Sequence, residues 1–163
     1  MAQGEFALVR QNLEVALGKS AQWVGEHDLY ALLADAAAQQ RDEAALRQYA
    51  PLAEAAAGRY RHLLYQAIAH RAWGVARRLA HEYTEAEARL NQALELFQKL
   101  DTHWQIGRTL FEMGELAASR ADTPAAHAHF QHALAMFEDM QAVPDAARAR
   151  AMLEGLNEGP VDD

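Results

Sequence analysis

The chain has 163 residues, and a hydrophobic content of 51% excludes a disordered polar chain. A formal net charge of -8 disfavours contact with nucleic-acid phosphates or an anionic membrane surface, so neither is an expected partner. Ala is abundant and β-branched residues are scarce, which indicates an all-α fold.

No apolar run approaches the roughly 18 residues that a membrane-spanning helix needs, so membrane insertion is not expected. Residues 1–10 lack the basic and apolar regions of a signal peptide. The chain contains no Cys, which fits a reducing compartment. We therefore expect a cytoplasmic location.

Apolar side chains at helical spacing predict a row of eight helices. The first carries Phe6, Val9, Leu13 and Leu17 on one face. The predicted helices cover residues 4–19, 26–40, 42–58, 60–82, 84–100, 103–121, 123–141 and 144–156. Because all connections are short, consecutive helices should pack antiparallel.

Several helix starts carry capping signals. Thr84 with Glu87 fits a capping box, and Thr123 precedes a Pro at the first helical position. Asp42 is the predicted cap of the third helix, and either Asp101 or Thr102 that of the sixth.

The sequence repeats itself at a shift of 40 residues, which is typical of stacked helical hairpins. Gly74 and Gly114 coincide at this shift, as do the large apolar residues Leu90 and Phe130. The other coinciding pairs include Ala86 with Ala126, Ala93 with Ala133, Leu94 with Leu134, and Phe97 with Phe137. A weaker copy lies 41 residues earlier. A small residue in the first helix lets the second helix approach closely.

Two units share one spacing of small residues. In each, an Ala follows the first small residue by 12 positions, and a second Ala follows seven positions later. Gly74, Ala86 and Ala93 have it, and so do the three residues 40 positions later. This pattern resembles the tetratricopeptide repeat, over about residues 27–141. The longer period also resembles repeats in large bacterial signalling and regulatory proteins, whereas the usual period is 34. Longer helices or looser links would explain the difference.

The resemblance implies a right-handed α-solenoid of antiparallel helical hairpins. We expect a single domain over residues 1–163, with an N-terminal helix and link at 1–25 and a capping helix at 144–156. The repeats should cover 26–58, 60–100 and 103–141, and the acidic tail at 157–163 should be frayed.

The resemblance also implies a concave wall made by the first helix of each hairpin. The partner-binding residues mapped onto it are His27, Tyr30, Arg71, Val75, Arg78, Arg108, Phe111 and Glu115. Three Arg on one groove would suit an acidic peptide or a free C-terminal carboxylate. Alternatively, these Arg pair with nearby acids such as Glu112 and Glu115.

The sequence favours a protein- or peptide-binding adaptor. A module that responds to a small ligand or signal peptide, and a scaffold that self-assembles into a homo-oligomer, stay open as alternatives. No nucleophile motif, P-loop or dinucleotide fingerprint occurs, so we expect neither an enzyme nor a cofactor.

The remaining aromatic and titratable residues fit structural roles. His127, His129 and His132 are close in sequence, but one helix face offers at most two metal ligands, so we expect surface His and no metal site. His70 stands where an apolar residue is usual and should be buried with a hydrogen-bond partner. Trp104 should pack over a helix end or, if exposed, mark a contact surface.

Overall fold

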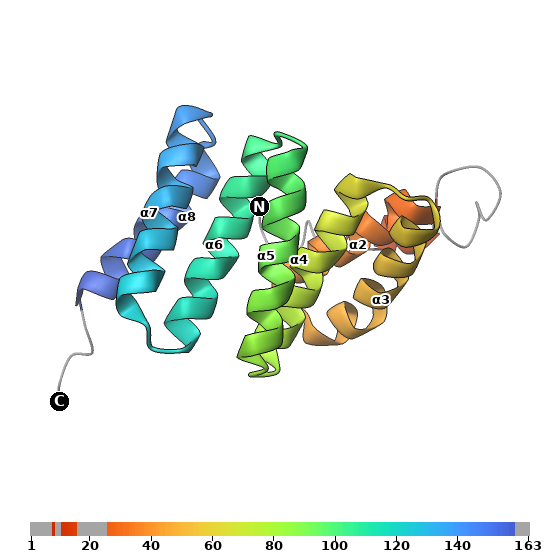
Figure 1. Cartoon of the computed structure of the whole chain (residues 1–163), viewed down its shortest axis with the longest axis horizontal. Coiled ribbons are helices and arrows are strands. Elements are labelled where there is room, and N and C mark those ends of the chain that lie inside the picture. The colour runs from red at the N-terminus through yellow and green to blue at the C-terminus, as the bar shows by residue number, and fades with distance from the viewer. Residues whose placement is uncertain (1–7, 9–10, 16–25, 159–163) are drawn as a thin grey trace. The chain divides into compact units, whose positions relative to one another are not determined.

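The computed structural model describes residue 8 and residues 11–15 and 26–158, and all regular structure among them is helical. This confirms the all-α prediction. The helices are α2 (Glu26–Gln40), α3 (Glu43–Arg59), α4 (Leu63–Leu79), α5 (Tyr83–Lys99), α6 (His103–Ser119), α7 (Thr123–Asp139) and α8 (Val143–Glu158) (Figure 1). Of the predicted helix at 4–19, Leu8 and residues 11–15 are helical, and the rest lies outside the described residues.

The links between consecutive helices share one backbone conformation. Each contains one non-glycine residue with a positive φ of 52–60°, and these recur every 20 positions at Arg41, Arg61, His81, Asp101, Ala121 and Gln141. In the link after α6, the N–H of Ala121 donates to the carbonyl of Ala118 at 3.0 Å, and that of Asp122 donates to Ala117 at 2.9 Å. This pair of bonds closes the end of a helix in a Schellman motif.

The repeat length follows from the helices. From α3 to α7, each helix has 17 residues and is followed by a link of three residues. Two helices with their links therefore make a unit of 40 residues. Longer helices rather than looser links account for the period seen in the sequence.

The caps of two helices are carboxylates. Asp42 accepts a hydrogen bond from the Ala45 N–H at 3.0 Å, which confirms it as the cap of α3. At α7 the cap is Asp122, whose carboxylate accepts from the Ala125 N–H at 3.1 Å. The prediction of Thr123 was wrong, because Thr123 is already the first helical residue.

The Schellman link also explains the other capping results. It places the residue before each helix directly after the positive-φ residue, so α5 begins at Tyr83 and Thr84 lies inside it. The predicted capping box at Thr84 was therefore wrong. At α6 the cap position is Thr102, one of the two predicted, but its side chain makes no capping hydrogen bond, and its hydroxyl instead donates to the Phe97 carbonyl at 3.2 Å.

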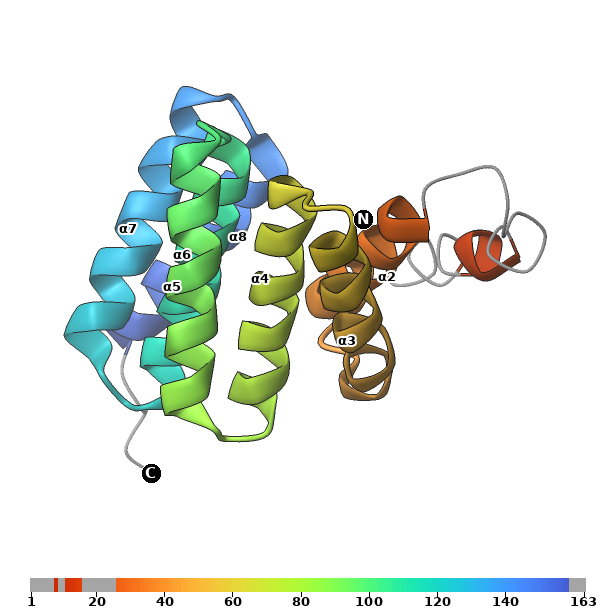
Figure 2. The same ribbon diagram turned by 45° about the vertical axis from the view of Figure 1, so that its right-hand side comes forward.

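The chain forms two compact units, Met1–Leu96 (unit 1) and Phe97–Asp163 (unit 2). In unit 1, α2, α3 and α4 share a core that includes Leu33, Leu46, Tyr49 and Val75, with Leu13 packed against it. Figure 2 shows α3 and α4 side by side within this unit. The core contains many Ala, which lets the helices approach closely.

In unit 2, two glycines of α6 receive two phenylalanine rings of α7. A Cβ on Gly114 would lie 2.6 Å from Cε1 of Phe130, and a Cβ on Gly107 would lie 2.8 Å from Cε1 of Phe137. In unit 1, a Cβ on Gly74 would lie 2.6 Å from Leu90 in the same way. In α4 and α6, the small residue is therefore a site of close helix approach, as the repeat pattern predicts.

Among the described residues, no helix is both long enough and apolar enough to cross a membrane.

Candidate partner-binding site

In unit 1, the arginine predicted to grip a partner is held by the protein itself. Arg71 of α4 is 1% exposed, and its Nη2 donates to Oδ1 of Asp35 in α2 at 2.8 Å. Oδ2 of Asp35 accepts a second bond from the Gln39 side chain at 3.0 Å. Arg71 therefore joins α4 to α2. The sequence analysis missed its partner Asp35, which is half-buried. The signal was an isolated acid in an alanine-rich helix.

The other predicted residues of unit 1 are divided between core and surface. Val75 is fully buried in the core, so it does not offer a contact surface in this structure. Tyr30 is half-buried and packs against the same core, and Arg78 is half-buried in the last turn of α4. The side chain of His27 lies outside the described residues.

A second polar network of unit 1 links α3, α4 and α5. Glu54 accepts hydrogen bonds from Nε1 of Trp73 at 2.8 Å and from Nη1 of Arg89 at 2.5 Å. The same Arg89 nitrogen lies 2.9 Å from Nδ1 of His70, which gives this histidine the partner predicted for it. The pKa of His70 is lowered, first by burial and then by the charge of Arg89, while Glu54 acts in the opposite direction.

Unit 2 brings two predicted residues into contact with aromatic rings. The Arg108 guanidinium lies 4.7 Å from the centre of the Trp104 ring, and that of Arg148 lies 4.8 Å from the centre of Phe111. Both distances permit a cation–π interaction. Phe111 also meets the edge of Phe130, with ring centres 5.2 Å apart. Arg108 and Phe111 are 8% and 5% exposed, so they support the surface rather than form it.

Two side chains of this group remain open to solvent. Trp104 is 42% exposed, and its Nε1 donates to Oδ2 of Asp145 in α8 at 3.0 Å. Arg148, one helical turn after Asp145, is exposed. We call Trp104, Arg108, Phe111, Asp145 and Arg148 the Trp104 cluster. Glu115, the last predicted residue, is half-buried on α6.

The sequence analysis missed Asp145 and Arg148 because it assigned α8 only a capping role. The spacing of Trp104, Arg108 and Phe111 places them on one face of α6, but nothing in the sequence pairs that face with α8. Trp104 both contacts the start of α8 and remains exposed, so each of the two predicted roles describes part of its environment.

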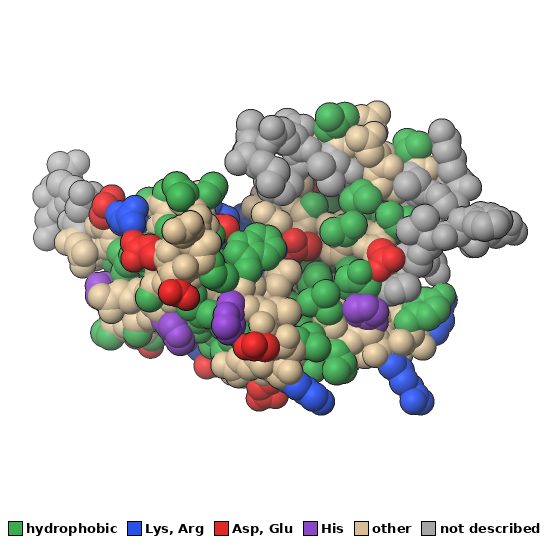
Figure 3. Space-filling model, turned by 90° about the horizontal axis from the view of Figure 1, so that it is seen from above, with side chains coloured by type: hydrophobic (Ala, Val, Ile, Leu, Met, Phe, Trp, Pro, Cys, Tyr) green, Lys and Arg blue, Asp and Glu red, His purple; other side chains and the backbone are tan. Residues whose placement is uncertain are grey.

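The surface does not concentrate positive charge on the face shown in Figure 3. Hydrophobic side chains are spread widely over it, and Lys and Arg side chains stand at scattered points. Basic attraction over a broad area is therefore not what this face offers a partner.

Within the described ranges, no three His, Asp or Glu side chains are grouped so that they could hold a metal ion. His132 is exposed, while His127 and His129 are half-buried. The hydroxyl of Ser119 donates to the Glu115 carbonyl at 2.8 Å, a bond within one helix.

Residues 65–139 match the family model of the tetratricopeptide repeat, a stretch that runs from α4 to the end of α7. These residues carry tetratricopeptide repeats. Tetratricopeptide repeats generally mediate protein–protein interaction or scaffolding and are typically not enzymes. The glycines at 74 and 114, beneath Leu90 and Phe130, are the small positions of these repeats.

The chain is also similar to a solved structure, that of BtubC (BKLC) from P. vanneervenii. The identity is 17% and the TM-score 0.63, over 96% of this chain and 73% of that chain. At this identity the likeness shows the fold alone, an all-α solenoid of helical repeats. No curated protein matches the sequence.

Proposed function

We propose that the chain is an adaptor that binds a protein or peptide, and that the Trp104 cluster of unit 2 is its main contact. The observation that supports this most is an exposed Trp104 held in place from two sides. Trp and Arg are the residues that most often dominate the energy of protein interfaces. The tetratricopeptide repeats supply the general role, and the cluster supplies the chemistry.

The cluster is preorganised. The indole N–H of Trp104 is bonded to Asp145, and its ring lies against the Arg108 guanidinium. Little side-chain freedom is then left to be lost on binding, which favours affinity. A dissociation constant on the order of 1 μM would be ordinary for such a contact.

The partner's chemistry follows from Arg148. This exposed guanidinium can form two parallel hydrogen bonds with a carboxylate while Trp104 offers a flat apolar surface. We infer a segment that combines an acidic group, either a side chain or a free C-terminal carboxylate, with an apolar residue. Neither a cofactor nor a catalytic step is needed for this role.

The test is a quantitative pull-down from cell lysate with the Trp104→Ala/Arg148→Ala variant beside the wild type. Both side chains are exposed, so the variant should keep its helical circular dichroism. Arg71 is left unchanged in this test. A charge-reversing Arg71→Glu substitution would place the new carboxylate next to Asp35 inside the protein.

The matched control is Tyr60→Ala/Arg47→Ala, which removes one exposed aromatic and one exposed arginine from unit 1. We expect proteins held by the wild type to be held by the control and lost by the Trp104 variant. Equal retention by all three would place binding elsewhere on the chain, and the proposal would be wrong.

A further inference from the structure

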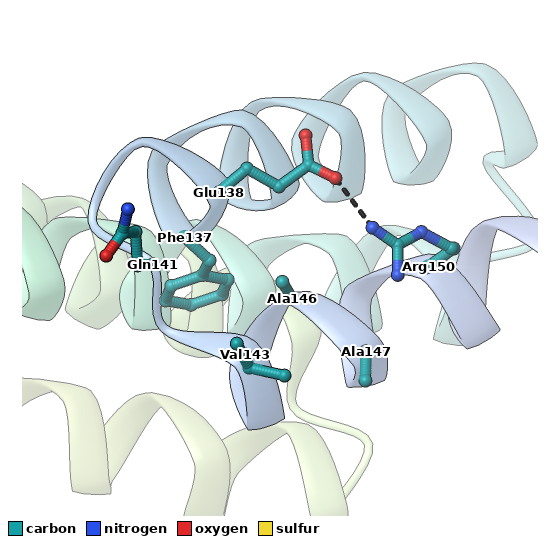
Figure 4. A pocket seen from close by; sticks show the side chains of 7 residues that line it. All are labelled: Phe137, Glu138, Gln141, Val143, Ala146, Ala147 and Arg150. Atoms are coloured by element: carbon teal, nitrogen blue, oxygen red, sulfur yellow. Dashed lines mark hydrogen bonds and ion pairs between the residues drawn. The ribbon is translucent and has the colours of Figure 1, made fainter.

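A pocket of about 500 Å³ lies between the end of α7 and the start of α8. The side chains that line it come from the last turn of α7, the following link and the first two turns of α8 (Figure 4). They are Phe137, Glu138, Gln141, Val143, Ala146, Ala147 and Arg150. Val143 at its edge is 72% exposed, which is a large value for an apolar side chain.

The repeat itself shows what would cover this pocket. Forty residues before Ala147 stands Gly107, at the equivalent place on α6. The ring of Phe137, from α7, lies directly over Gly107. Ala147 thus gives α8 a small surface like the one at Gly107, where α6 receives an aromatic ring from the next helix. Over Ala147 there is a pocket in place of a ring.

We propose that this pocket, the α8 acceptor, binds an amphipathic helix of another protein through one aromatic anchor. The helix lies on α8 as α7 lies on α6, and its anchor sits over Ala147 as Phe137 sits over Gly107. The volume is within the range of ligand-binding pockets, which leaves ample room for one aromatic side chain. This inference does not rest on the function proposed for the Trp104 cluster.

The anchor pattern argues against a second copy of the chain as the occupant. Within the described residues, α5 and α7, the second helices of the hairpins, hold their large repeat side chains inside the protein. Phe97, Phe130 and Phe137 are at most 1% exposed, and Leu90 is fully buried. Another copy would have to unfold a hairpin to offer any of these four side chains as the anchor.

The rim of the pocket sets the character of the contact. Oε1 of Glu138 lies 2.6 Å from Nη2 of Arg150, and the two charges balance each other (Figure 4). With a neutral rim and an apolar floor, binding should depend weakly on salt. Further along α8, Glu154 replaces the glycine that α6 has at 114, so the acceptor covers only the first half of the helix.

The probe is a synthetic peptide of residues 122–140, which contains α7 and its anchors. A hydrocarbon staple between positions 128 and 132, exposed in α7, keeps it helical. Its binding to the full chain is measured by fluorescence anisotropy. We expect saturable binding that a peptide with Phe137→Ala weakens about thirtyfold, because a single aromatic anchor dominates.

Two variants of the full chain block the acceptor without touching the core. Ala147→Trp fills the pocket and Val143→Glu places a charge at its edge, and both positions are exposed. Each should weaken the probe about tenfold or more. Glu154→Trp, two turns along α8, and the Trp104→Ala/Arg148→Ala variant should leave the affinity unchanged.

The inference is overturned if the stapled peptide does not bind. It is equally overturned if Ala147→Trp and Val143→Glu bind the peptide as the wild type does. A mass of two chains in solution that Ala147→Trp reduces to one would also overturn it, because the pocket would then belong to a second copy.

Discussion

Gly114 and Phe130 are in direct contact across the α6–α7 hairpin. A Cβ on Gly114 would lie within 2.9 Å of three atoms of the Phe130 ring, and this ring is fully buried. Gly114→Leu should therefore lower the free energy of unfolding by about 1–3 kcal/mol or more. Urea unfolding monitored by circular dichroism measures the change.

Gly58 provides the control for this prediction. It lies inside α3, and a Cβ there would meet nothing within 4 Å. Gly58→Ala should raise the free energy of unfolding by up to ~1 kcal/mol through helix propensity. A neutral result for Gly114→Leu would mean that α6 and α7 are not packed as described.

Ala121, at a positive φ of 58°, should gain from replacement by glycine. A Cβ in this region costs about 1–2 kcal/mol, and the greater freedom of unfolded glycine cancels part of the gain. We expect Ala121→Gly to raise the free energy of unfolding by about 0.5–1 kcal/mol. Ala118→Gly, three residues earlier inside α6, should lower it by about 1 kcal/mol. Changes of the same sign would contradict the Schellman link.

The ion pair of buried Arg71 with half-buried Asp35 should be sensitive to removal of one partner. Asp35→Ala leaves the buried guanidinium without this carboxylate and should cost about 3–5 kcal/mol. The double variant Asp35→Leu/Arg71→Met should recover most of this loss, because it removes both charges. If Asp35→Ala alone costs less than about 1 kcal/mol, the ion pair does not join α2 to α4.

His70 should make the protein less stable in mild acid. Its pKa is lowered in the folded state, so below the unfolded value of about 6.5 the unfolded chain takes up the proton more readily. Its stabilising effect is therefore complete above pH 6.5 and is lost as the pH falls through the folded pKa.

Urea unfolding of the wild type and His70→Gln between pH 7.5 and 5 tests this. The free energy of unfolding should fall more steeply in the wild type, by no more than about 1.4 kcal/mol per pH unit for one proton. Parallel curves would show that burial and the charge of Arg89 do not hold His70 neutral.

The sequence predicted the helices because apolar and small residues repeat at fixed spacing. Gly74 and Gly114 mark close contacts in the structure as they do in the pattern. The links were harder to predict, since none of their positive-φ residues is glycine. Caps that depend on these links, such as Asp122 in place of Thr123, were then misplaced by one or two residues.

The candidate site could be predicted only in part. A repeat pattern places Arg71, Arg108 and Phe111 on the first helices, but it does not say which side chain lies opposite. Asp35 meets Arg71 from a helix 36 residues away, and Arg148 meets Phe111 from α8. Such pairings depend on how hairpins pack, so they emerged only from the structure.

The most direct test of partner binding through the Trp104 cluster is ¹⁹F nuclear magnetic resonance of protein labelled with 5-fluorotryptophan. Trp104→Phe and Trp73→Phe variants assign their signals, and the protein recovered in the pull-down is then added. We predict that the Trp104 signal shifts or broadens at saturation while that of Trp73, bonded to Glu54 in unit 1, changes little. A bound partner that leaves the Trp104 signal unchanged would contradict the proposal.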